Sequence, residues 1–179
     1  MEWDMLQAIG DLAFRVPFLR RVRRNHALEH ATIHVLSRRL RARLRVVGRS
    51  NSRGFFIYGQ VETSDLVGAV YEALDRLRRG EHELAVHPNC GTNLLTSAVM
   101  TSLASFAALA GARRLSDQIN RLPTAVFFAT AALILSQPLG LNLQRTVTTE
   151  PRLGDLEVVE VRRTLESPVV VHWVATRSS

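Results

Sequence analysis

Two long stretches of the chain contain no Arg, Asp or Glu, and this feature limits the fold more than any other. The first covers residues 84–112 and the second covers residues 122–144. Each stretch can supply a helix of about 20 residues, the length that crosses a hydrocarbon core of about 30 Å. Because the connection between them is short, we expect an antiparallel transmembrane hairpin, with a buried helical pair in a soluble domain as the alternative.

The two stretches differ in the size of their side chains. The first is rich in Ala, Ser and Thr, which allow two helices to pack closely within a membrane. The second is bulkier, and Gln137 with Pro138 predicts an interruption late in its helix. Arginines are more numerous at the outer ends of the hairpin than in its connection. We therefore expect a protein of the cell membrane whose main domain lies in the cytoplasm.

Outside the hairpin, the pattern predicts a small mixed domain of the α+β class, with N-terminal helices and a short antiparallel sheet. The transmembrane hairpin would interrupt this domain, since strand-like segments occur on both sides of it. The expected regions are an amphipathic N-terminal helix at 1–24, an α+β region at 25–92, the hairpin at 93–144 and C-terminal strands at 145–179 that complete the domain.

Several local elements can be placed within this domain. Apolar and β-branched residues predict strands at 44–47 and 55–61 around a polar turn. A helix is expected at 63–79, with Thr63 as its N-cap. Its buried stripe is expected to consist of Leu66, Val70, Leu74 and Leu77. Further strands are expected at 84–86, 146–149, 156–164 and 169–175.

One short segment carries a pattern that points to chemistry. His26, Glu29 and His30 form an H-x-x-E-H box within a helix expected at 25–44. Residues four apart lie on one face of a helix, one turn from each other, so the two imidazoles could hold one metal ion. Glu29 projects beside them and is the candidate general base. His34 lies about 12 Å along the helix from His26, too far to share an ion, and is expected to support either the metal ligands or the fold.

A later loop offers two further candidate metal ligands. His87 and Cys90 lie in the segment 87–93, whose Pro and Gly predict a turn before a helix capped by Thr92 or Asn93. Either His87 or Cys90 would complete three ligands and leave the fourth position of zinc open, as catalysis requires. Both together would close the site and indicate a structural metal.

The pentapeptide from His26 to His30 resembles the box of the inverted zincins, the metallopeptidases of the insulinase and pitrilysin type. This resemblance implies that the two histidines ligate zinc and that Glu29 is the general base. Those enzymes take a third ligand, a Glu, from a later helix. The chain has no convincing counterpart, because Glu72 is expected to face solvent.

A wider set of segments resembles a family of uncharacterised bacterial membrane proteins that is classed as a domain of unknown function. The segments are 25–34, 87–93 and 139–144. This resemblance covers most of the chain and implies a small integral membrane protein, without implying an activity.

The leading hypothesis is a membrane-associated, zinc-dependent hydrolase of the peptidase class, acting on a peptide substrate. The alternative is a non-catalytic membrane protein whose histidines form a structural metal site or a hydrogen-bonded core. A minor alternative is binding of anionic lipid or nucleic acid, because residues 1–50 hold eleven Arg against four acidic residues. Apolar residues interleave these arginines and aromatic residues are few, so we expect the lipid bilayer as partner and no specific nucleic acid.

Overall fold

The fold is described from a computed structural model that places residues 16–40, 45–166 and 168–179. These residues form two compact units. The first combines the described residues up to His87 with Arg145–Ser179, and the second is Pro88–Gln144. Most of the helix expected at 1–24 lies outside the described residues.

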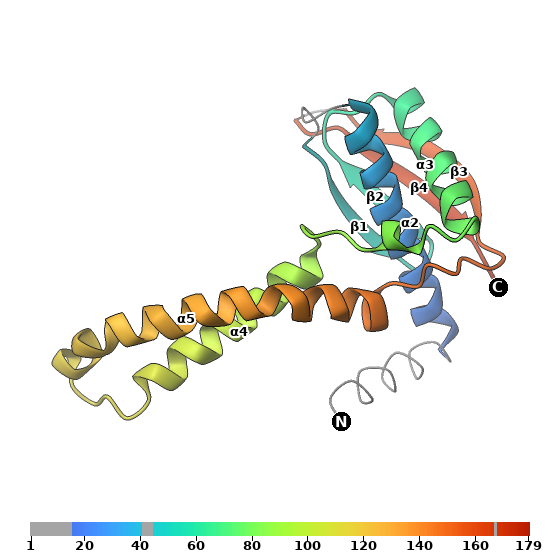
Figure 1. Cartoon of the computed structure of the whole chain (residues 1–179). Coiled ribbons are helices and arrows are strands. Elements are labelled where there is room, and N and C mark those ends of the chain that lie inside the picture. Colours follow the sequence, from blue (N-terminus) through green and yellow to red (C-terminus); the bar gives the residue numbers. More distant parts are fainter. Residues whose placement is uncertain (1–15, 41–44, 167) are drawn as a thin grey trace. The chain divides into compact units, whose positions relative to one another are not determined.

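The first unit is a four-stranded antiparallel sheet with two helices packed on one face, so the fold is α+β as predicted (Figure 1). The strand order is β1-β2-β4-β3. Because β4 pairs with β2, the C-terminal strands complete a sheet that begins before the second unit. The elements are α2 (Pro17–Leu40), α3 (Thr63–Arg78), β1 (Val47–Asn51), β2 (Gly54–Tyr58), β3 (Glu157–Leu165) and β4 (Val171–Arg177).

Alternation along the strands determines which face the helices cover. Phe55 and Ile57 of β2 and Val174 of β4 are fully buried beneath the helices. The intervening Phe56 and Trp173 pair on the opposite face, with ring centroids 4.5 Å apart. Burial of each large apolar side chain contributes roughly 1.5–3 kcal/mol. The buried stripe expected along α3 is confirmed and consists of Leu66, Val70, Leu74 and Leu77.

Two segments that were predicted as strands have other structures. Residues 82–85 form the short 3-10 helix η1 (His82–Ala85), and residues 144–148 form the π-helical turn η2 (Gln144–Thr148). Short apolar or β-branched runs do not by themselves distinguish a strand from other structure. In both segments, or directly after them, backbone carbonyls bond to histidines of α2 rather than to a neighbouring strand.

The hairpin of β1 and β2 is also shifted from its expected position. Gly48 and Ser50 were assigned to the turn, yet they pair with β2 as part of β1. Both lie against a side chain of α2, so tertiary contact overrides their weak strand propensity. Thr63 was wrongly predicted as the N-cap of α3, because Glu62 holds that position and the Thr63 hydroxyl bonds to His172.

The helix that carries the H-x-x-E-H box begins earlier than expected. It starts at Pro17 and ends at Leu40. Proline is well suited to the first helical position, since its missing N–H has no partner there in any case. The basic residues from Arg20 to Arg24 therefore belong to the same helix as His26 and His30.

The second unit is a pair of helices, α4 (Gly91–Leu109) and α5 (Leu115–Leu143). Both are long and apolar enough to cross a membrane, by length and composition. The expected interruption near Pro138 is wrong, because α5 continues through this residue to Leu143. Helices in membranes tolerate internal proline where other groups satisfy the backbone that it releases. Large apolar side chains are exposed along both helices and include Leu94, Leu103, Phe106, Val126, Phe127 and Ile134.

Polar side chains join these two helices at their inner faces. The hydroxyl groups of Ser97 and Ser136 lie 2.6 Å apart, and Gln144 donates to the Asn93 amide oxygen at 2.8 Å. Gly140 lies against Asn93, where an added Cβ would have no room. Small residues thus let the helices approach closely, as the sequence of the first stretch predicted.

Candidate metal centre

Three histidines of α2 form a stripe along one side of the helix, and a fourth histidine lies beside them. The ring centroids of His26 and His30 are 4.3 Å apart, and a ring nitrogen of each lies within 4.8 Å of the other. His87, at the end of the segment after η1, has its ring 5.9 Å from that of His30 and 4.9 Å from that of His34. The structure therefore brings His26, His30 and His87 into one cluster.

Backbone carbonyls set the protonation of the ring nitrogens in the stripe. His30 Nδ1 lies 2.7 Å from the Ala85 carbonyl, and His26 Nδ1 lies 3.0 Å from the Thr148 carbonyl. A carbonyl oxygen only accepts, so each Nδ1 must carry a hydrogen and donate it. In the neutral ring, Nε2 then holds the lone pair. Histidines that bind metals usually donate their other N–H to a carbonyl or carboxylate in this way.

His34 is held differently from the two histidines of the box. Its Nε2 lies 2.9 Å from the Val86 carbonyl, so in His34 the nitrogen that bonds to the backbone is Nε2. His34 thereby links α2 to the segment after η1. His87 is half-buried, and its pKa is lowered by burial and by the neighbouring His34.

Glu29 is buried between α2 and β1. Its carboxylate accepts a hydrogen bond from the Ser50 hydroxyl, and Gly48 packs directly against it. Burial raises the pKa of this carboxyl, while the charge of His26 and the bond from Ser50 act in the opposite direction. A carboxylate with a raised pKa is a stronger proton acceptor than an exposed one.

The remaining candidates have clear places in the fold. Cys90 is buried and lies at the N-cap of α4 in the second unit, where its sulfur accepts from the Thr92 N–H at 3.4 Å. This residue, not Thr92 or Asn93, is therefore the cap. Glu72 pairs with Arg39 and Arg76 on the outside of α3.

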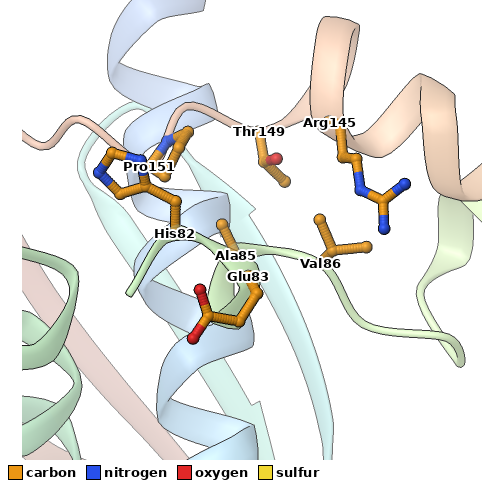
Figure 2. Close-up of a pocket in the computed structure, with 7 residues that line it drawn as sticks. All are labelled: His82, Glu83, Ala85, Val86, Arg145, Thr149 and Pro151. Atoms are coloured by element: carbon orange, nitrogen blue, oxygen red, sulfur yellow. The ribbon is translucent and has the colours of Figure 1, made fainter. Parts of the chain in front are cut away.

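The segments that hold the histidines also line a pocket of about 330 Å³ (Figure 2). Its walls are His82, Glu83, Ala85 and Val86 on one side and Arg145, Thr149 and Pro151 on the other. The carbonyls of Ala85 and Val86 accept hydrogen bonds from His30 and His34, and the same two residues line the pocket. The sequence did not predict this pocket. Its one signal is Arg145, the first charged residue after the apolar stretch 122–144, which lines the pocket.

Acidification is expected to destabilise the fold through His30. Burial and the nearby His26 lower the pKa of His30 from 6.5 to about 3. Between these two values the unfolded chain binds a proton that the folded chain does not take up. This contribution to stability is fully present above pH 6.5 and is lost as the pH falls toward 3, by about 1.4 kcal/mol per pH unit.

Chemical unfolding of the detergent-solubilised chain, with a chelator present, measures this slope. The matched variant is His30→Asn, whose amide can still donate to the Ala85 carbonyl but does not titrate. The native chain should lose stability more steeply than the variant below pH 6.5. If the stability of the two proteins falls in parallel as the pH is lowered, the pH dependence does not come from His30.

The first unit is thus a small α+β domain with a buried histidine cluster, and the second is a helical hairpin of membrane-spanning length. The chain belongs to the family described as Domain of unknown function (DUF6391), whose model matches residues 21–161. It is 37% identical over 183 residues to an uncharacterized protein of Picosynechococcus sp., covering 94% of this chain and 86% of that protein. No solved structure matches the chain.

Proposed function

We propose that this protein is a membrane-anchored, zinc-dependent hydrolase of the peptidase class. The observation that carries the proposal is the pairing of Nδ1 of both His26 and His30 with backbone carbonyls, beside a buried Glu29. This pairing presents two Nε2 lone pairs from one face of α2. A neutral imidazole is the form that binds zinc, and the lowered pKa of His30 keeps its ring neutral.

The roles of the residues follow from their positions. His26 and His30 would hold the ion through Nε2, and the third ligand would come from the segment that starts at His87. Cys90 is three residues further along, so its Cα lies within about 11 Å of that of His87 whatever the arrangement of the two units. Zinc, when bound, supplies a Lewis acid for a substrate carbonyl and for water.

Glu29 would accept the proton of the attacking water and pass it to the leaving amine. Ser50 holds the Glu29 carboxylate by donating to one of its oxygens, so the carboxylate keeps one orientation. Such a fixed general base contributes about 100- to 10,000-fold to a rate. The hairpin of α4 and α5 would anchor the domain in the cell membrane, with the domain on the cytoplasmic side.

A second candidate is a non-catalytic membrane protein with a structural metal site or a hydrogen-bonded histidine core. The burial of the box favours it, since His30 is 2% exposed and Glu29 is 4% exposed. A substrate would need to reach these groups past the segments that hold them. Buried polar residues that are fully hydrogen-bonded can serve the fold alone.

Glu29→Gln separates the two candidates. The full chain should purify in detergent with about one zinc per molecule, and the variant should retain it, because Gln keeps the size of the side chain. Hydrolysis of a fluorogenic peptide library should fall by at least about 100-fold. Glu157→Gln, which replaces an exposed carboxylate of β3 that does not line the pocket, is the control and should keep full activity.

Equal hydrolysis by the native chain and Glu29→Gln would overturn the catalytic proposal in favour of the structural one. A native chain that binds no transition metal would overturn both metal proposals.

A further inference from the structure

Arginine side chains gather around the chain segment that directly follows α5. Arg23 of α2 donates to the carbonyls of Thr146 and Thr149, at 3.0 and 3.2 Å, which joins this part of α2 to η2. Arg20 lies about one helical turn before Arg23, and Arg24 follows Arg23 directly. Arg145 belongs to η2 itself. The basic residues of α2 and the start of η2 therefore form one region of the first unit.

The carboxylates in this region do not balance its positive charge. Arg24 pairs with Asp155, and Glu150 pairs with both Arg23 and Arg152. Within residues 16–40, 45–166 and 168–179, the side chains of Arg21 and Arg145 have no hydrogen-bond or ion-pair partner. Arg20 donates to the Ser179 main-chain oxygen at 2.8 Å. Uncompensated guanidinium groups attract phosphate, which they can bind through two parallel hydrogen bonds.

Apolar residues precede these arginines and indicate a lipid surface as the partner. Phe18 is 60% exposed and Leu19 is 40% exposed, at the start of α2 and immediately before Arg20. A helix that presents aromatic and aliphatic side chains next to arginines is typical of the boundary between acyl chains and headgroups. Nucleic acid would contact the arginines but would leave the exposed aliphatic side chains without a partner.

Chain connectivity independently places this region near a bilayer. Arg145 is the first charged residue after the apolar stretch 122–144 and the second residue after α5. When α5 spans a membrane, Arg145 must lie at the headgroup level of one leaflet. The bonds from Arg23 to Thr146 and Thr149 then bring the start of α2 to the same level.

We propose that Arg20, Arg21 and Arg145 form a binding site for the phosphate of anionic phospholipids, with Phe18 and Leu19 entering the acyl boundary. This inference rests on the membrane insertion proposed above and is independent of the metal centre. Anionic lipid would hold the first unit against the leaflet from which α5 emerges. Each arginine near an anionic surface contributes about 1 kcal/mol, so three of them change affinity by about 100-fold.

The test uses the full chain in mixed detergent micelles, with bound lipid measured by native mass spectrometry. Short-chain phosphatidylglycerol should bind at least about 10-fold more tightly than phosphatidylcholine of the same length. The triple variant Arg20→Gln, Arg21→Gln, Arg145→Gln should lose this preference. The corresponding triple Lys variant should keep it, because the charge is retained, and thereby shows that the native fold persists at these positions.

A matched control removes arginines from the other end of the same helix. Arg38→Gln with Arg39→Gln leaves the start of α2 unchanged, and 18 residues of helix separate it from Arg20, or about 27 Å. This double variant should bind phosphatidylglycerol as the native chain does. Equal loss in the control and the triple variant would overturn the site and indicate a general charge effect.

Other outcomes separate the remaining explanations. Release of the chain from membranes by alkaline carbonate would overturn membrane insertion and this inference together. Retention in the membrane with unchanged lipid preference of the triple Gln variant would overturn this inference alone. Displacement of phosphatidylglycerol by inorganic phosphate or by a single-stranded oligonucleotide at similar concentration would overturn the assignment to lipid.

Discussion

Replacing His30 by Ala is expected to abolish zinc binding by this protein. The substitution removes one of the two proposed Nε2 ligands and also leaves the Ala85 carbonyl without its donor. Loss of a group that merely supports a metal ligand costs about 10- to 100-fold in affinity, so loss of the ligand itself should exceed about 100-fold. Metal analysis of the purified chain should fall from about one zinc per molecule to background.

Two further variants make this result interpretable. His30→Asn keeps a donor toward the Ala85 carbonyl, so it should keep the native fold even if loss of this hydrogen bond unfolds His30→Ala, and it should also lose zinc. His82→Ala removes an exposed histidine of η1 and should retain the full zinc content. Zinc bound equally by the native chain and His30→Asn would show that the box is not the metal site.

Replacing Gly48 by Ala is expected to damage both stability and the proposed activity. An added Cβ at this position would overlap the Glu29 carboxylate, which is buried and bonded to Ser50. Either β1 moves away from α2, or the Glu29 carboxylate loses its hydrogen bond from Ser50. Overpacking of a core costs about 1–3 kcal/mol, and a lost hydrogen bond to a charged group costs about 1.5–3 kcal/mol. We expect the free energy of unfolding to fall by about 2–4 kcal/mol.

Chemical unfolding of the full chain in detergent measures this loss. Gly91→Ala is the control, since a Cβ at Gly91 meets open space, and it should unfold like the native chain. Combining Gly48→Ala with Glu29→Ala removes the overlap, so the double variant should lose less stability than the sum of the single changes. Additive losses would indicate that Gly48 and Glu29 do not interact.

The two predictions show where sequence reasoning about the site succeeds and where it ends. The spacing of His26 and His30 places both on one face of α2, because helical geometry follows from local backbone structure. The role of Gly48 is not visible in the sequence, where it reads as a turn residue next to Ser50. Position 48 requires a glycine because β1 closely approaches Glu29, which lies 19 residues earlier in the chain.

The wrong predictions share one physical origin. The segments after η1 and around η2 were assigned as strands from residue type, but their carbonyls bond to histidines and an arginine of α2. These partners are more than 50 residues away in the chain, so no local pattern reports them. Backbone groups that find side-chain partners have no need of a neighbouring strand.

The sequence by itself determined the α+β class, the two helices of membrane-spanning length, the buried stripe of α3 and the pairing of His26 with His30. These features depend on periodicity and on the length of apolar runs, both of which are local. Only the tertiary structure decided that carbonyls of residues 85 and 148 orient the two imidazoles, that His87 joins them and that Gly48 makes room for Glu29. Each of these contacts joins segments that are far apart in the chain. The packing of the whole unit determines where these segments lie.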